Sequence, residues 1–551
     1  MTAIPSAGVA ATAPEAAPRR VPAIRSARAG WALLAVGATA ALAALVLSQP
    51  RSVIDPASLA LSPAELIERA REVIATTTGW SATGDMASGF EYSQDYLAYL
   101  DLIPELDERR RARRSSPPPI LFWYRQSARR LVPEAGHDLL RLGFDSPPVH
   151  RPSEIAVRLD AEGRLVELRR WPRASESRQQ DDAWEPVFEA AGLELGSFRE
   201  LYARFVPPVP ADARFEWTGE SDLFAGEELG VKGATVEGRP TYFRYEGAWG
   251  TRVPPPVHDL STLPRGAVGL LVLFVGGLAW RHRSVGRDDR LANRRLALAS
   301  GLMALLVLAQ SPGRLLRSLD PAYALVLAGL CLTFAAAAWI GAVALGPRLA
   351  RWPGVMDAWS SFWSGSWRRR EVASAVLIGA CGGGLLALLA GLAWWLPVWL
   401  GRTAVETRPA IGGLAGGWAA FEAILLALGR GLLWTGFVAL VLELSRMVLR
   451  LRLLAAIATA GVVLVLHLPS SPIGWIVMAA YAALWVALLV RWGLLAALIA
   501  AWVDEMFDLA LVSDLGHWAS QTSWGVLAVT FTLLIAGAWG LARAQPAALA
   551  R

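Results

Sequence analysis

Residues 372–400 read VASAVLIGACGGGLLALLAGLAWWLPVWL, a run without a charged side chain. A transmembrane helix needs about 17 to 25 apolar residues, so this run predicts a helix that crosses a bilayer. The composition agrees, because 54% of the 551 residues are hydrophobic, only 18% are charged and the mean hydropathy is +0.38. Soluble domains carry about 25% charged residues, so a cytosolic enzyme is excluded and most of the chain is predicted to lie in a membrane.

Apolar runs recur through the C-terminal half of the chain and once near the N-terminus. The N-terminal run, 31–48, follows four arginines of an Ala/Pro-rich tail, and no small-x-small cleavage site follows it. We interpret this run as an uncleaved anchor, with a signal peptide as the alternative. Together the runs predict about ten transmembrane helices: 31–48, 266–280, 296–310, 321–346, 372–400, 412–445, 453–468, 473–490, 493–512 and 523–541.

Arginine clusters in the connecting loops predict the orientation. They follow the second, fourth, sixth, eighth and tenth runs, on the side that carries the N-terminal arginines, as the positive-inside rule requires. We expect both termini in the cytoplasm and residues 49–264 outside, in a multi-pass protein of a bacterial inner membrane. Two short outer loops depart from the rule, since one carries Arg314 and Arg317 and the other Arg402 and Arg408.

The charges also divide the chain into an acidic part and a basic part. Residues 51–264 hold 26 basic and 34 acidic residues, a net charge of −8, whereas residues 265–545 hold 22 and 12, a net charge of +10. We therefore predict a cytoplasmic disordered tail (1–30), a transmembrane anchor (31–48), an extracytoplasmic α+β domain (49–264), transmembrane helices with a cytoplasmic interfacial helix (265–370) and a C-terminal transmembrane bundle (371–545).

The outer domain contains local signals for helices and hairpins. Ser62 followed by Glu65 predicts a capped helix over 62–74. Alternating apolar and polar residues about Gly163 and Gly238 predict two β-hairpins. Each hairpin follows a helix candidate and a short strand, so we expect a duplicated helix-plus-strands unit.

Three local patterns have structural interpretations. Trp359, Trp363 and Trp367 recur every four residues, which is typical of a helix in the cytoplasmic headgroup layer or of an aromatic belt. The Gly-Gly-Leu-Ala-Gly-Gly stretch at 412–417 predicts a small-x-x-x-small packing face. The arginine cluster at 109–114 lies among acidic residues and prolines, and it predicts a solvated loop.

Cysteine and histidine give no sign of a metal site or a cofactor. Cys331 and Cys381 both fall inside apolar runs, and the six histidines are scattered, so we expect no disulfide framework and no bound metal. The outer domain has no Gly-rich phosphate loop and no nucleophile motif. Its expected partners are the lipid bilayer and a peptide, protein or envelope ligand, and no nucleic acid.

Ionisable side chains inside the last five runs are the candidates for function, because each costs about 2.5 to 3.5 kcal/mol on insertion scales unless it is paired or faces water. The predicted topology places Glu422, His467 and Asp508 in the outer half of the bilayer, where they could line one cavity. Asp504 and Asp508 are four residues apart and are expected to share a helix face. The full set is Glu422, Arg430, His467, Asp504, Glu505 and Asp508.

This set is compatible with three roles. Two carboxylates beside an imidazole can activate a water molecule for hydrolysis. They can equally form a proton relay in a transporter, or fix helix register through an ion pair with Arg430. The spacing alone leaves these roles open.

The order of these residues resembles the CPBP family, intramembrane proteases that comprise CAAX prenyl proteases and bacteriocin-processing or self-immunity proteins. The family signature is E-E-x-x-x-R, then F-x-x-x-H, then H-x-x-x-N. Val463-Leu-Val-Leu-His467 matches the second motif apart from its valine, and Asp504-Glu-Met-Phe-Asp508 keeps the spacing of the third with aspartate at both ends. The resemblance covers about residues 370–545, a third of the chain.

The first motif is degenerate. Arg430-Gly-Leu-Leu-Trp-Thr435-Gly-Phe aligns best with it but has no glutamate pair, and the register Glu422-Ala-Ile-Leu-Leu-Ala427 keeps one glutamate and loses the arginine. Because the family's glutamate activates the attacking water, the resemblance implies an inactive member with site residues Glu422, His467, Asp504 and Asp508. We therefore predict that the outer domain binds a ligand and presents it to the bundle.

Two other functions remain as alternatives. The first is an active intramembrane endopeptidase, in which Glu422 or the pair of Asp504 and Asp508 replaces the missing glutamate. The second is a transporter, although the runs between 266 and 400 have almost none of the polar lining that transport requires.

Overall fold

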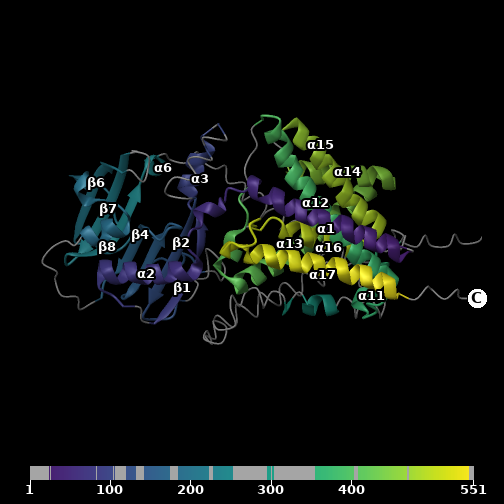
Figure 1. Cartoon of the computed structure of the whole chain (residues 1–551), viewed down its shortest axis with the longest axis horizontal. Helices are drawn as coiled ribbons and strands as arrows, with labels where there is room; N and C mark the ends of the chain where they lie inside the picture. Colours follow the sequence, from purple (N-terminus) through teal and green to yellow (C-terminus); the bar gives the residue numbers. More distant parts are fainter. Residues whose placement is uncertain are drawn as a thin grey trace, which may run out of the picture.

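The computed structural model describes Ile24 and residues 26–251, 294–302 and 354–544. Within these ranges the undescribed residues are 82–83, 104, 106–108, 110–118, 132–141, 174–183, 222–227, 300, 403–406, 468–470 and 510. The predicted spans 266–280 and 321–346 lie outside the described residues, as do most of the span 296–310 and most of the arginine cluster. The described chain forms a helical bundle joined to a β-sheet domain (Figure 1).

Five helices of the described chain are long and apolar enough to cross a membrane. One precedes the sheet domain and four follow it, so the chain is a multi-pass membrane protein, although ten spans are not shown. The five helices are α1 (Ala27–Arg51), α12 (Arg370–Trp399), α13 (Gly417–Leu449), α15 (Pro472–Ala487), which the turn η5 (Leu488–Trp492) extends, and α17 (Gln521–Arg543), which the turn η6 (Trp518–Ser520) precedes.

Two further apolar helices, α14 (Arg452–His467) and α16 (Leu494–Met506), are shorter. Their 16 and 13 residues extend about 24 and 20 Å at 1.5 Å per residue, against a hydrocarbon layer of about 30 Å. The expectation that 493–512 forms a single span is therefore wrong, because the helix ends at Met506 and the chain continues as an irregular segment.

Helix α12 forms the centre of the bundle and contacts α1, α15, α16 and α17 (Figure 1). Gly379 and Gly383 allow it to approach α16 closely, since a Cβ atom on Gly383 would lie 2.6 Å from the carbonyl oxygen of Ala500. The prediction that residues 412–417 form a small-x-x-x-small face of one helix is wrong. That stretch belongs to the 3-10 turn η4 (Ile411–Ala415) and the start of α13, and it is not one helix face.

The tryptophans near residue 360 do not lie on one helix face either. The short helix α11 (Asp357–Trp363) ends at Trp363, so Trp367 lies beyond it. Trp359 is buried against the bundle, whereas Trp367 is exposed. The four-residue spacing predicted a longer helix than the chain forms here.

The sheet domain has eight antiparallel strands in the order β1-β2-β3-β4-β8-β7-β6-β5. Four strands form a meander in each half of the domain, and the two halves meet where β4 pairs with β8. In each half a helix precedes the first strand of the meander in the chain, an order compatible with the duplicated unit, which stays a prediction. The elements are α2 (Pro63–Thr78), β1 (Asp85–Tyr92), α3 (Gln94–Asp101), β2 (Ile120–Ser127), β3 (Glu154–Leu159), β4 (Leu165–Trp171), α5 (Glu185–Ala190), β5 (Phe198–Leu201), β6 (Ala213–Glu220), β7 (Glu228–Val236) and β8 (Arg239–Glu246).

Local signals explain where these elements start and turn. The side chain of Ser62 accepts a hydrogen bond from the backbone of Glu65, whose carboxylate in turn accepts from the backbone of Ser62, so the predicted capping box begins α2. The two predicted hairpins are β3–β4 and β7–β8, and Gly163 and Gly238 adopt φ angles of 84° and 73° in their turns. Glycine adopts such positive φ angles without steric cost.

The sheet domain and the bundle are joined by a shared core. Ile411 and Leu414 of η4 belong to the same buried cluster as the core of the sheet domain, as do Val512 and Ala519. Directional contacts cross the same junction: Val53 N–H donates to Thr407 O at 2.9 Å, Tyr92 Oη–H to Pro409 O at 2.7 Å, and Trp518 Nε1–H to Leu59 O at 3.0 Å. The two parts are therefore packed together rather than tethered by a linker.

Candidate functional site

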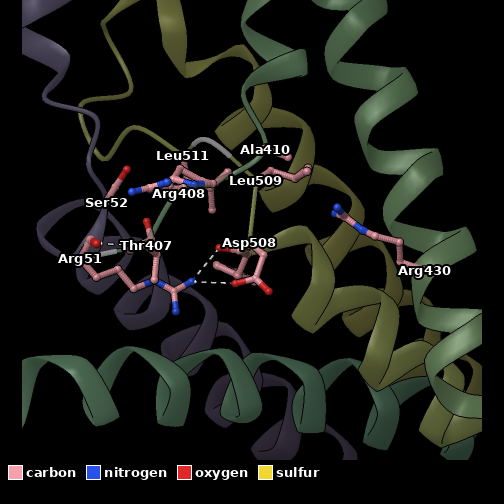
Figure 2. A pocket seen from close by; sticks show the side chains of 12 residues that line it. Arg51, Ser52, Thr407, Arg408, Ala410, Arg430, Asp508, Leu509 and Leu511 are labelled. Atoms are coloured by element: carbon pink, nitrogen blue, oxygen red, sulfur yellow. Dashed lines mark hydrogen bonds and ion pairs between the residues drawn. The ribbon is translucent and has the colours of Figure 1, made fainter. Parts of the chain in front are cut away.

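A pocket of about 420 Å³ lies at the junction of the sheet domain and the bundle (Figure 2). Four segments that are distant in sequence line it: the end of α1 with Ser48, Arg51 and Ser52, residues 407–410, Arg430 of α13, and the segment after α16 with Phe507, Asp508, Leu509 and Leu511. Its lining thus holds three arginines and one aspartate.

Arg51 connects α1 to the end of α16. Its Nη2 donates to the carbonyl oxygen of Phe507 at 2.9 Å and to Asp508 Oδ1 at 3.2 Å. The Arg51 side chain is 8% exposed, whereas that of Asp508 is 66% exposed. Because α16 presents unpaired carbonyl groups at its C-terminal end, a cation at this position stabilises that end of the helix.

The other two arginines also have carboxylate partners. Nε of Arg430 lies 3.0 Å from Glu505 Oε2, which ties α13 to α16. Nη2 of Arg408 lies 2.5 Å from Asp101 Oδ2 at the end of α3, so this contact joins the pocket rim to the sheet domain. The side chains of Arg430 and Arg408 are 44% and 42% exposed, so both guanidinium groups remain open to a ligand.

Tyr92 supports the pocket rim from the sheet domain. Burial raises the pKa of its hydroxyl above the usual value, although the nearby Arg408 opposes this shift. The hydroxyl therefore stays protonated at neutral pH and donates to the carbonyl oxygen of Pro409. This hydrogen bond fixes the backbone next to Arg408.

Two of the residues predicted from the sequence, Asp504 and His467, contact the same tyrosine inside the bundle. Asp504 accepts a hydrogen bond of 2.5 Å from the hydroxyl of Tyr481, and the Tyr481 ring centroid lies 5.0 Å from that of His467. His467 also lies 5.7 Å from the ring of Trp434 and has its Nδ1 atom 2.7 Å from Val463 O. Helices α13, α14, α15 and α16 thus each contribute one side chain to this cluster.

The other two predicted residues lie elsewhere. Asp508 lines the junction pocket and sits in the turn beyond α16, so the expectation that it shares a helix face with Asp504 is wrong. Glu422 is half-buried on α13 and precedes Arg430 by eight residues, about 12 Å along a helix axis. Of Glu422, His467 and Asp508, only Asp508 lines the pocket in the described chain.

Arg51 and Arg408 were not among the predicted site residues. Arg51 falls just after an apolar run, where a basic residue is unremarkable. Arg408 gave a usable signal, because it lies in an outer loop and departs from the positive-inside rule. Such a departure indicates a cation that the fold requires at that position.

A second charged cluster lies on the sheet. Arg158 pairs with Glu91, Asp145 and Glu167, and its guanidinium carbon lies 3.9 Å from the centre of the Phe144 ring. Burial raises the pKa of Glu91 even though Arg158 opposes the shift. Burial also acts to raise the pKa of Asp145, but Arg158 and Arg169 outweigh it and the pKa falls. These mutual pairs indicate a structural role across strands β1, β3 and β4.

The fold and the pocket define a multi-pass membrane protein that carries an eight-stranded antiparallel sheet domain. No family model, curated protein or solved structure matches the chain. Among the described residues, no group of three or more His, Cys, Asp and Glu side chains is placed to hold a metal ion. The described chain thus offers two candidate functional sites, the junction pocket and the cluster around Asp504.

Proposed function

We propose that this chain is a bacterial inner-membrane protein with a CPBP-like but non-proteolytic bundle, which binds an envelope ligand at the junction pocket. In the proposed orientation both termini are cytoplasmic, and the sheet domain and the pocket lie on the outer side. A ligand in this pocket contacts the end of α1, the rim at 407–410 and the bundle residue Arg430 together. The sheet domain supports this site through the contacts of Tyr92 with Pro409 and of Asp101 with Arg408.

The observation that carries the proposal is the pairing of the three carboxylates around the third motif. Asp504 accepts from Tyr481, Glu505 pairs with Arg430, and Asp508 pairs with Arg51. A general base must hydrogen-bond the attacking water and accept its proton, whereas each of these three carboxylates already contacts a protein side chain. Arg430, at the motif position of the family's glutamate, adds a positive charge where a base is needed.

A cleavage assay tests the absence of proteolysis. Purified full-length protein in proteoliposomes is incubated with quenched prenyl-peptide and transmembrane-peptide substrates, with an active CPBP protease as the positive control. We expect no cleavage above that of a Glu422→Ala/His467→Ala variant. Cleavage that Glu422→Ala or His467→Ala abolishes would overturn the proposal.

One observation favours the alternative of an active endopeptidase. His467 and Asp504 both contact Tyr481, His467 through its ring and Asp504 through the tyrosine hydroxyl. In that case His467→Ala and Asp504→Asn would each remove cleavage, and Arg51→Gln in the junction pocket would leave it intact. The same assay therefore separates the two functions.

A further inference from the structure

We propose that the junction pocket binds a phosphate group, and that the phosphate belongs to a lipid headgroup of the outer leaflet. This inference rests on the proposed function, because it names the ligand class of the same pocket. It draws on the three arginines that line the pocket, on the hydrogen-bond donors that they leave open, and on the position of the pocket at the end of the α1 span.

Three arginines from three separate segments surround the pocket. Figure 2 shows Arg430 extending from α13 toward the side occupied by Arg51 and Arg408, with Asp508 between them. Asp508 is the one acidic residue of the lining. The lining side chains alone carry a net charge of +2. Glu505 and Asp101 pair with Arg430 and Arg408 from outside the lining, so an anion in the pocket shares these arginines with their carboxylate partners.

The existing contacts use only part of each guanidinium group. The ion pair with Glu505 engages Nε of Arg430, and the pair with Asp101 engages Nη2 of Arg408. A guanidinium group has five N–H donors in a planar fork that matches two phosphate oxygens. Among the interactions of the described residues, the outer nitrogens of Arg430 and Nη1 of Arg408 stay available for such a fork.

The pocket lies at the depth of the lipid headgroups. The apolar part of α1 covers Ala27–Ser48, and its 22 residues extend about 33 Å, close to the thickness of the hydrocarbon layer. Ser48 at the end of this stretch and Arg51 just beyond it both line the pocket. Two exposed tryptophans, Trp399 at the end of α12 and Trp524 near the start of α17, lie at the helix ends nearest the junction, as an interfacial aromatic belt requires.

Phosphodiesters are the common anions of that layer, and basic pockets between helices bind lipid headgroups. Apolar lining residues such as Leu509 and Leu511 are compatible with the glycerol and upper acyl region of a lipid. Asp508 is the acidic side chain of the lining, and it is 66% exposed while it pairs with Arg51. A phosphate that enters the pocket competes with Asp508 for Arg51.

Lipid binding to the purified full-length protein tests the inference. Native mass spectrometry measures the affinity for phosphatidylglycerol and, in parallel, for diacylglycerol with the same acyl chains, which lacks the phosphate. We expect phosphatidylglycerol binding to fall by about tenfold or more in Arg408→Gln/Arg430→Gln, since a charge-assisted hydrogen bond contributes about 1.5 to 3 kcal/mol. Arg402→Gln is the matched control, because Arg402 is an exposed arginine of the same outer loop outside the pocket.

A second variant guards against a loss of binding through misfolding. Asp508→Asn removes the competing anion of the lining, so it should strengthen phosphatidylglycerol binding, and a damaged fold would not produce such a gain. Equal affinities of the wild type, Arg408→Gln/Arg430→Gln and Arg402→Gln would overturn the inference, as would equal binding of diacylglycerol. Weaker binding to Asp508→Asn than to the wild type would also contradict it.

Glycerol phosphate and inorganic phosphate form the second arm of the experiment. If the source is a lipid, neither competes with phosphatidylglycerol at millimolar concentration. If they do compete, the pocket recognises a soluble phosphate, and the assignment to a lipid is wrong. The cleavage assay is independent of both arms, so a failure here with no proteolysis leaves the non-proteolytic role in place.

Discussion

Arg430 and Glu505 show how partly exposed charges are accommodated on apolar helices. An isolated ionised side chain in this environment costs several kcal/mol. The two residues lie on α13 and α16, and their 3.0 Å contact satisfies both charges. Asp504 is satisfied in another way, through the hydroxyl of Tyr481.

We predict that Arg430 and Glu505 are energetically coupled. Arg430→Gln and Glu505→Gln should each lower the free energy of unfolding, while the double variant should lose less than the sum of the two, by about 1 kcal/mol. This coupling energy lies at the upper end of the range that is typical of partly exposed ion pairs. A double-mutant cycle from denaturant unfolding in mixed micelles measures it, and strictly additive losses would contradict the pairing.

The sequence could identify these residues but not their partners. Glu422, Arg430, His467, Asp504 and Asp508 stand out because each interrupts an apolar run. Which of them meet depends on helix packing, and periodicity carries no information about that. The split between Asp504 at Tyr481 and Asp508 at the pocket follows from the end of α16 at Met506, a boundary that the apolar pattern did not reveal.

Local signals predicted the elements of the sheet domain well. The capping box at Ser62 and the hairpin turns at Gly163 and Gly238 depend on residues close in sequence, so they could be read directly. The pairing of β4 with β8 joins the two halves of the domain. This pairing links strands that are far apart in the chain, so the alternation of apolar and polar residues along each strand could not predict it.

Close helix packing depends on glycines that the sequence did not single out. On α12, a Cβ atom at Gly383 would lie 2.5 Å from Val503 Cβ and 2.6 Å from Ala500 O. A side chain with a Cβ atom at position 383 would therefore clash with α16 and push the two helices apart. At Gly436 of α13, by contrast, a Cβ atom would meet nothing within 4 Å.

We therefore predict opposite outcomes for two Gly→Ala substitutions in membrane helices. Gly383→Ala should destabilise the bundle by about 1 to 3 kcal/mol, the usual cost of an overpacked core. Gly436→Ala should leave stability unchanged or raise it, because alanine is the better helix former. Thermal unfolding of the two variants in the same detergent measures the difference, and similar melting temperatures would refute the close contact of α12 with α16.

At the scale of the whole molecule, the main feature is the junction between the sheet domain and the bundle. The composition predicted two parts, an acidic domain and a basic bundle, but it did not predict that they share a core. Trp518 illustrates why: its ring stacks on Phe90 of β1 at a centroid distance of 6.1 Å, and its Nε1–H donates to Leu59 O. A tryptophan at the end of an apolar run would otherwise be assigned to the aromatic belt.

The shared core also determines what the protein can do with a ligand. Arg408 touches the sheet domain through Asp101, while Arg430 touches the bundle through Glu505. A ligand bound between them therefore contacts one arginine that is tied to the sheet domain and one that is tied to the bundle. Because the two parts share a core, we expect them to move as one body, and ligand binding then needs no domain closure.

The distance between the two parts tests this claim most directly. Cys331 and Cys381 are replaced, and spin labels are placed at Glu189→Cys on α5 and Ile476→Cys on α15, both exposed positions. Labels at Glu189→Cys and Ala75→Cys, both within the sheet domain, provide the reference. In proteoliposomes the account predicts a single distance distribution between domain and bundle that is as narrow as the reference pair, whereas a broad or two-peaked distribution would contradict it.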